Sequence, residues 1–204
     1  SVDPINVGDT AVVTVTVPDN ATGIVTIEID GVKYNATVDK GKAVFNIENL
    51  TAGNKTIAVA YAGDDNYFAN YTTAAISVSK SKVSDMEVEI SDIDAGDNLT
   101  VKVKLPDDAT GQVLIDIDGV GYYLNVTDGV GEAQIPYLPS GNYTVTLTYT
   151  GDDKYGPTTK TASFEVSKVE SFVIPVAEDI AVGEAEVISI RVPSDATGTV
   201  TYKF

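Results

Sequence analysis

The chain has 204 residues, of which 30 are acidic and 13 basic, so its formal net charge is −17, and it has neither cysteine nor histidine. This composition excludes disulfides, zinc sites, thiol chemistry and histidine-based acid–base catalysis, and it excludes nucleic acid as a partner because phosphates would be repelled. The apolar content of 43% is nonetheless sufficient for ordinary hydrophobic cores.

A tandem repeat organises the chain. When the sequence is shifted by 88 positions, 34 of residues 1–80 match their counterparts in 89–168 without a gap. A further copy of the same pattern starts after residue 168 and includes the segment PSDATG at 193–198. The repeat therefore predicts three units: 1–80 with a truncated first strand, 81–168, and 169–204 as the N-terminal part of a third unit.

The first unit reads as a succession of short strands. Alternating valines over 13–17 predict a strand that Pro18 ends, and 25–29 and 32–38 alternate in the same way around an Asp30-Gly31 hairpin turn. A short strand at 43–47, a long strand at 54–61 and a last strand that ends at Val78 are predicted to follow. The expected core consists of Val13, Val15, Val25, Ile27, Ile29, Val32, Tyr34, Val38, Ile57 and Val59, with their counterparts 88 residues further on.

About seven strands in each unit, with a turn every 8–12 residues and no helical period, predict an all-β protein. We expect tandem antiparallel immunoglobulin-like β-sandwiches. The connecting segments 79–82 and 167–168 are very short, so the sandwiches should be joined end to end.

The second unit carries a recognisable family pattern. Its segments 106–111, 117–122, 138–149 and 151–157 resemble the immunoglobulin-like repeats of large adhesin-like surface proteins of methanogenic archaea, and they are similar to bacterial immunoglobulin-like repeats. The first unit departs from the pattern, with Lys55 in place of Tyr143. The resemblance implies a secreted, many-repeat protein at the cell surface or cell wall, whose repeats act as the stalk or spacer of an adhesin.

Asparagine is concentrated in Asn-X-Thr sequons. Eight of the eleven asparagines stand in such sequons, whereas the serine and threonine content would place about two there by chance. Threonine-rich strands account for part of this excess. The sequons predict N-glycosylation at a cell surface. The candidates are Asn20, Asn35, Asn49, Asn54, Asn70, Asn98, Asn125 and Asn142.

Acidic turn residues form a second group of candidates. In an immunoglobulin topology, end-to-end stacking of the first two units would bring several carboxylates to one junction, where calcium could bind. The candidate ligands are Asp9, Asp30, Asp107, Asp108, Asp152 and Asp153. The competing explanation is that Lys80 and Lys82 of the linker neutralise these carboxylates without metal, and this is the outcome we expect.

No nucleophile–base pair is visible, and the Asp-Asp pair recurs at the same turn of both units, so the sequence predicts a non-enzymatic protein without a cofactor other than calcium. No apolar run reaches membrane-spanning length. The expected partners are neighbouring repeats of the same longer chain. Two other functions stay open: binding of surface glycans or of host or partner-cell proteins through the pole loops, and assembly as a structural wall or fibre subunit.

Overall fold

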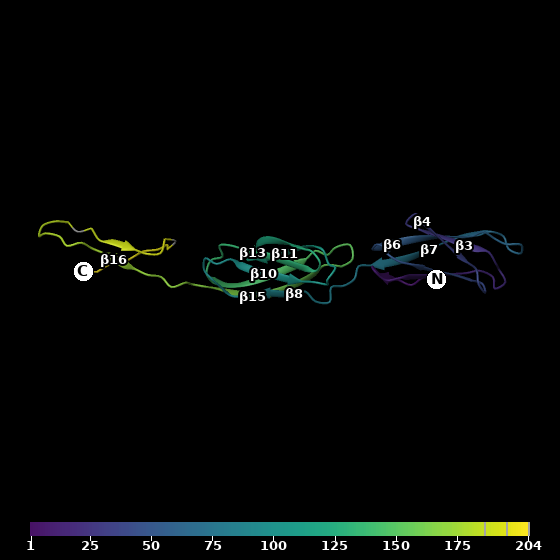
Figure 1. Ribbon diagram of the computed structural model, residues 1–204, viewed down its shortest axis with the longest axis horizontal. Helices are drawn as coiled ribbons and strands as arrows, with labels where there is room; N and C mark the ends of the chain where they lie inside the picture. The colour runs from purple at the N-terminus through teal and green to yellow at the C-terminus, as the bar shows by residue number, and fades with distance from the viewer. Residues whose placement is uncertain (186, 195, 204) are drawn as a thin grey trace.

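The computed structural model describes residues 1–185, 187–194 and 196–203. In this part of the chain it contains 17 strands and no helix, so the all-β prediction is confirmed. Two sandwiches and a small hairpin follow one another along the longest axis of the molecule (Figure 1). No helix capable of spanning a membrane occurs among the described residues.

The first sandwich is built from seven strands. They are β1 (Ile5–Asn6), β2 (Ala11–Thr16), β3 (Ile24–Ile29), β4 (Val32–Thr37), β5 (Lys42–Ile47), β6 (Gly53–Tyr61) and β7 (Asn70–Ser79). One sheet has the order β1-β7-β6-β3-β4, and the facing sheet consists of β2 and β5. All neighbouring strands are antiparallel except β1 and β7, which are parallel.

The second sandwich repeats this plan with one additional strand. Its strands are β8 (Glu87–Ile90), β9 (Ile93–Asp94), β10 (Leu99–Lys104), β11 (Gly111–Ile117), β12 (Val120–Val126), β13 (Val130–Ile135), β14 (Gly141–Tyr149) and β15 (Thr158–Ser167). The sheets have the orders β9-β15-β14-β11-β12 and β13-β10-β8. The chain therefore changes sheets between β8 and β9. These are the tandem immunoglobulin-like sandwiches that the sequence predicted.

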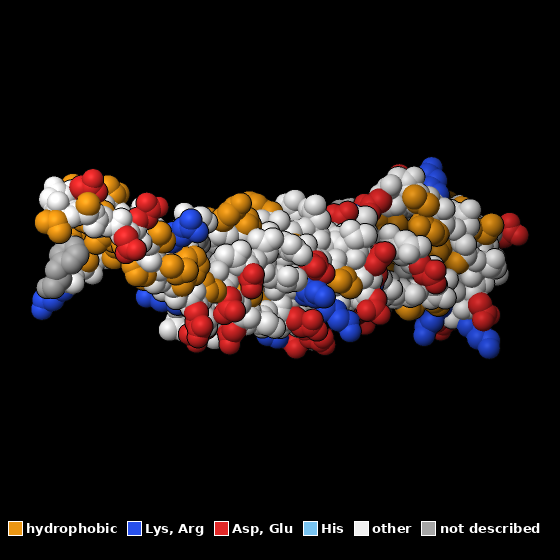
Figure 2. Space-filling view, turned by 60° about the vertical axis from the view of Figure 1, so that its left-hand side comes forward, with side chains coloured by type: hydrophobic (Ala, Val, Ile, Leu, Met, Phe, Trp, Pro, Cys, Tyr) orange, Lys and Arg blue, Asp and Glu red, His pale blue; other side chains and the backbone are white. Residues whose placement is uncertain are grey.

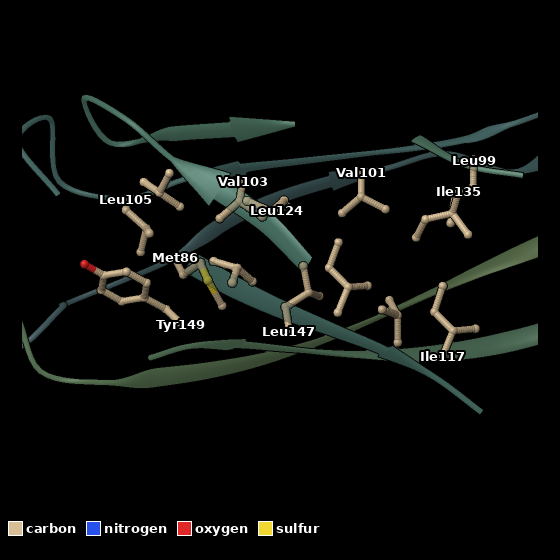
Figure 3. Close-up of a cluster of buried hydrophobic side chains, with 14 of the residues drawn as sticks. Met86, Leu99, Val101, Val103, Leu105, Ile117, Leu124, Ile135, Leu147 and Tyr149 are labelled. Atoms are coloured by element: carbon tan, nitrogen blue, oxygen red, sulfur yellow. The ribbon is translucent and has the colours of Figure 1, made fainter. Parts of the chain in front are cut away.

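Alternation of apolar and polar residues places the core between the two sheets. Leu99, Val101 and Val103 of β10 are no more than 1% exposed and face Ile117, Leu147 and Tyr149 of the other sheet (Figure 3). The intervening lysines of β10 point outward, because successive side chains of a strand lie on opposite faces. The same alternation buries Ile27 and Ile29 in the first sandwich.

The predicted core contains two errors. Val32 and its counterpart Val120 pair with Ile29 and Ile117 as the hairpin turn requires, but they are 51% and 53% exposed. Each is the first residue of an edge strand, β4 or β12, and therefore has a neighbouring strand on one side only. The predicted register is therefore correct, and these side chains lie on the inner face of their sheet. The opposite sheet, however, does not cover them. Three further predicted core residues are only half-buried, namely Val15, Tyr34 and Tyr122.

The C-terminal hairpin reproduces one strand pair of the second unit. Strand β16 (Ile174–Val176) pairs with β17 (Ser189–Arg191) so that Ile174 lies opposite Arg191, and Glu87 lies opposite Lys104 at the equivalent position of β8 and β10. Most of the hairpin's described side chains are exposed. The division of the chain at residues 80 and 168 stays a prediction.

Candidate functional site

The loop between the two longest strands of each sandwich carries an aspartate that holds two loops together. In the second unit one carboxylate oxygen of Asp152 accepts hydrogen bonds from the backbone N–H of Thr110 at 2.8 Å and from its hydroxyl at 3.2 Å. The other oxygen accepts from the N–H groups of Lys154 and Tyr155 at 2.8 and 2.6 Å. Asp152 therefore ties the β14–β15 loop to the turn that precedes β11.

The first unit has the same arrangement. Asp64 accepts from the N–H and hydroxyl of Thr22 at 2.7 and 3.1 Å, and from the N–H groups of Asn66 and Tyr67 at 2.8 Å each. These hydrogen bonds, that from Thr22 first, hold the pKa of Asp64 well below the ordinary aspartate value. The Asp64 carboxylate therefore supports the fold through these hydrogen bonds. It is not a free metal ligand at the end of the sandwich.

A buried tyrosine in each unit forms a hydrogen bond to the same threonine that the aspartate binds. The hydroxyl of Tyr149 donates to the carbonyl oxygen of Thr110 at 2.7 Å, and that of Tyr61 donates to the carbonyl oxygen of Thr22 at 2.9 Å. Burial, followed by the neighbouring Asp152 carboxylate, raises the pKa of Tyr149. Each tyrosine therefore stays protonated as a hydrogen-bond donor at neutral pH.

The pKa of Asp152 is also lowered. Burial acts to raise it, but the hydrogen bonds from the backbone N–H groups of Tyr155, Thr110 and Lys154 outweigh burial. A group whose pKa is lower in the folded than in the unfolded chain contributes stability above its unfolded pKa, near 3.9 for aspartate, and loses that contribution as pH falls through the folded value.

We therefore expect Asp152→Asn to lower the free energy of unfolding of the second unit at pH 7 by about 1–3 kcal/mol, because the amide cannot accept all four hydrogen bonds. The partial exposure of the loop favours the lower end of this range. Below pH 4 the difference from the unmodified chain should shrink. Amide hydrogen exchange in β14, measured from pH 7 to pH 2, would test this. Asp153→Asn, at the exposed adjacent position, is the control, and equal pH slopes for all three proteins would contradict the prediction.

The linker between the first two units is hydrogen-bonded to this loop. The N–H of Ser81 donates to the carbonyl oxygen of Lys154 at 2.8 Å, and the N–H of Gly156 donates to the carbonyl oxygen of Ser81 at 2.9 Å. The ammonium group of Lys80 donates to the carbonyl oxygen of Asp152. Ser81 and Tyr155 thereby form a parallel β-bridge. The loop stabilised by Asp152 is also the surface on which the first unit is attached.

The six candidate calcium ligands do not gather at this junction. Asp9 accepts from the N–H of Asn6 within its own turn at 3.0 Å, and Asp30 forms an ion pair with Lys55 at 2.8 Å. Asp107 and Asp153 are exposed on the loops beside Asp108 and Asp152. Among the described residues, no group of three or more acidic side chains is arranged to hold a metal ion. Calcium binding stays a prediction.

The expectation that the linker lysines pair with these carboxylates was wrong. In the part of the chain that the structure describes, Lys80 contacts a main-chain oxygen, and the carboxylate of Asp108 pairs instead with Lys154 at 2.5 Å. That carboxylate also accepts from the hydroxyl of Tyr155 at 2.6 Å. The lysine and this hydrogen bond lower the pKa of Asp108.

A signal for this pair was present in the repeat. The first unit has Asn20 and Asn66 where the second has Asp108 and Lys154, so both members of the pair change together. In the first unit the hydroxyl of Tyr67 donates to the side-chain oxygen of Asn20. The tyrosine hydrogen bond is therefore present in both units, and the second unit adds an ion pair to it.

All eight sequon asparagines are exposed. As predicted, Asn35 and Asn125 lie on outward-facing positions of the edge strands β4 and β12. The side-chain oxygen of Asn35 accepts from the hydroxyl of Thr26 at 2.7 Å, and that of Asn125 accepts from the side-chain amide of Gln112 at 3.0 Å. Both lie on accessible surface, and their glycosylation stays a prediction.

Residues 1–79 match the family model of the bacterial Ig-like domain (group 3), which supports an immunoglobulin-like domain in the first unit. Similar solved structures include the fibronectin(III)-like modules of Clostridium thermocellum CbhA, with 13% identity over 81% of this chain and 90% of that chain and a TM-score of 0.35. The I-band fragment from titin is 13% identical over 100% of this chain and 80% of that chain, with a TM-score of 0.36. The comparison with curated proteins gave no match.

Proposed function

We propose that this chain is part of the stalk or spacer of an extracellular adhesin, which holds a more distal region away from the cell surface. The observation that carries the proposal is the attachment of the linker to the following unit. Strand β7 ends at Ser79, and Ser81 is already bridged to Tyr155 of the next sandwich. One residue, Lys80, separates these two fixed points, so the angle between the sandwiches has little freedom.

Two further features suit a spacer. The first and second units lie in line (Figure 1), so the molecule is long for its number of residues. Acidic side chains spread over the visible face of the molecule (Figure 2), and a net charge of −17 favours solubility and discourages lateral association. The exposed sequons are compatible with N-glycans on such a rod, and the resemblance to archaeal adhesin-like repeats suggests an archaeal cell wall as its location.

Ligand binding through the pole loops has less support. The carboxylates of Asp64 and Asp152 are each occupied by four hydrogen bonds within their own unit, and Asp108 is paired with Lys154. A ligand would have to compete with these contacts. The backbone of the Asp152 loop is also used by the linker.

The spacer function is tested by measuring how freely the first two units move. Because the chain has no cysteine, one spin label can be placed on each unit at introduced cysteines, for example Asp39→Cys and Asp128→Cys. We expect a narrow distance distribution, and a much broader one when Gly-Ser-Gly-Ser is inserted between Lys80 and Ser81. The same insertion after Lys168 is the control and should change nothing. A distribution that is equally broad with and without the first insertion would rule out a stiff spacer.

A further inference from the structure

The outward face of the larger sheet of the first sandwich has an open pocket of about 520 Å³, which we call the outer-face pocket. Its volume lies within the roughly 300–1,000 Å³ of small-molecule sites. Two rows of side chains that run across neighbouring strands line it. The first row is Lys33, Glu28, Ala58 and Thr73, and the second is Thr26, Ala60 and Tyr71.

Small side chains on the middle strand make this face hollow. Ala58 and Ala60 of β6 lie between longer side chains of β3 and β7, because residues opposite each other on neighbouring strands share a face. Their methyl groups form an apolar floor. Tyr71 of β7 forms one wall and is 76% exposed. A ligand can therefore reach both the floor and the aromatic ring from solvent.

The opposite wall carries one basic and one acidic group. The ammonium group of Lys33 and the carboxylate of Glu28 are 3.7 Å apart, and their side chains are 70% and 45% exposed. A long, exposed ion pair contributes little to stability, so a ligand can bind both groups at small cost. The ammonium group donates hydrogen bonds and the carboxylate accepts them. The outer-face pocket thus combines donors, acceptors and an aromatic ring around an apolar floor.

The corresponding surface of the second sandwich has different chemistry. Its equivalents of the two alanines, the tyrosine and the lysine are Thr146, Thr148, Thr159 and Gly121. The hydroxyl oxygens of Thr148 and Thr159 are 3.4 Å apart, so side chains of β14 and β15 meet where those of β6 and β7 leave space. The second sandwich therefore has neither the aromatic wall nor the ion pair at this place.

The outer-face pocket is not the place of an additional strand. In the second sandwich the extra strand β8 pairs with β10, in the opposite sheet. Thr159 is exposed there, and Thr146 and Thr148 are half-buried, although the whole segment 81–88 is present. This face is thus open to solvent in a complete unit.

We propose that the outer-face pocket of the first unit binds a neutral sugar of a glycan. The C–H groups on one face of a pyranose ring carry partial positive charge and pack on the negative face of an aromatic ring such as that of Tyr71. Sugar hydroxyls both donate and accept, so they match the adjacent Lys33 and Glu28 side chains. These two side chains together add no net charge, and a chain of net charge −17 repels acidic sugars. The inference does not depend on the spacer function.

The test is binding of the full chain, produced without glycosylation, to an array of neutral and acidic oligosaccharides. The array carries fragments of polysaccharides and the glycans of glycoproteins, so the class that binds identifies the source of the sugar. We expect neutral sugars to bind. In NMR spectra with the bound oligosaccharide, signals of Ala60 and Thr73 should shift, whereas those of Thr148 and Thr161 should not.

Variants locate the site. Tyr71→Ala should weaken binding about tenfold or more, because the sugar loses its aromatic wall. Thr159→Ala, at the equivalent position of the second unit, is the matched control and should leave binding unchanged. The double substitution Ala58→Thr and Ala60→Thr should also weaken binding about tenfold or more, because it fills the floor. It introduces the residues that β14 has at these positions, so the strand should still form.

The proposal fails if no neutral oligosaccharide binds at about 10 mM, where a site with a Kd of about 1 mM would be about nine-tenths occupied. It also fails if Tyr71→Ala binds as tightly as the unmodified chain, or if Thr159→Ala weakens binding as much, because the sugar would then lie elsewhere. Preferential binding of acidic oligosaccharides would contradict the neutral chemistry that we assign to the ligand.

Discussion

Alanine in place of Gly129 is expected to unfold the second unit or to lower its free energy of unfolding severely. Gly129 has φ = 73°, and a Cβ atom there would lie 2.4 Å from the carbonyl oxygen of Pro106 and 2.9 Å from the Cα of Asp107. The backbone cannot turn away, because Gly129 donates to the carbonyl oxygen of Ala109 and accepts from the N–H of Leu105. Backbone strain of about 1–3 kcal/mol and overpacking of about 1–3 kcal/mol together give about 2–6 kcal/mol, a large fraction of a domain's stability.

Gly119→Ala is the matched control for this substitution. Gly119 has φ = 83° at the β11–β12 hairpin, but no atom lies within 4 Å of the position that a Cβ would take. Only the strain of a left-handed backbone applies there, about 1–2 kcal/mol. Urea unfolding of both variants would separate the two effects. If Gly129→Ala costs no more than Gly119→Ala, the close approach to Pro106 has no energetic consequence and the prediction fails.

Strand positions and most of the core could be predicted because they depend on local alternation. Ile27 and Ile115 were placed correctly from the sequence, since a residue's face in a strand follows from its neighbours. The exposure of Val32 could not be predicted in this way. Its exposure depends on where the opposite sheet ends, which is a property of the assembled sandwich.

The roles of the acidic residues were harder to predict. Aspartate after glycine signals a turn, but the turn residue alone does not tell which N–H groups its carboxylate accepts. The link from Asp152 to Thr110 joins residues 42 positions apart, and it exists only because two loops meet at the same end of the sandwich. The sequence therefore predicted that these aspartates occupy turns, but not that Asp64 and Asp152 hold two loops together by accepting hydrogen bonds.

The linker contact was missed for a similar reason. The lysines of segment 79–82 were considered as charges. Two of the three hydrogen bonds that attach this segment to the second unit instead involve the backbone of Ser81, which donates one and accepts the other. Backbone donors and acceptors are present at every residue. Sequence alone therefore does not tell whether a linker is hydrogen-bonded to the next unit.

Tyr149 should be among the most sensitive positions of the molecule. It is 0% exposed, and its hydroxyl satisfies the carbonyl oxygen of Thr110. Tyr149→Phe should cost about 1 kcal/mol, because only this hydrogen bond is lost. Tyr149→Ala should cost about 3–5 kcal/mol, because it also leaves a large cavity in a close-packed core.

The counterpart Tyr61 offers the decisive comparison. It makes the same hydrogen bond, to Thr22, but its ring lines an open pocket of about 250 Å³ that β2 and the loop between β6 and β7 also line. A cavity beside an opening can relax or admit water, so Tyr61→Ala should destabilise the first unit less than Tyr149→Ala destabilises the second. Unit-resolved hydrogen exchange can measure both losses in one chain. Equal losses would mean that the pocket does not lessen the cost of removing the Tyr61 ring, and the prediction would fail.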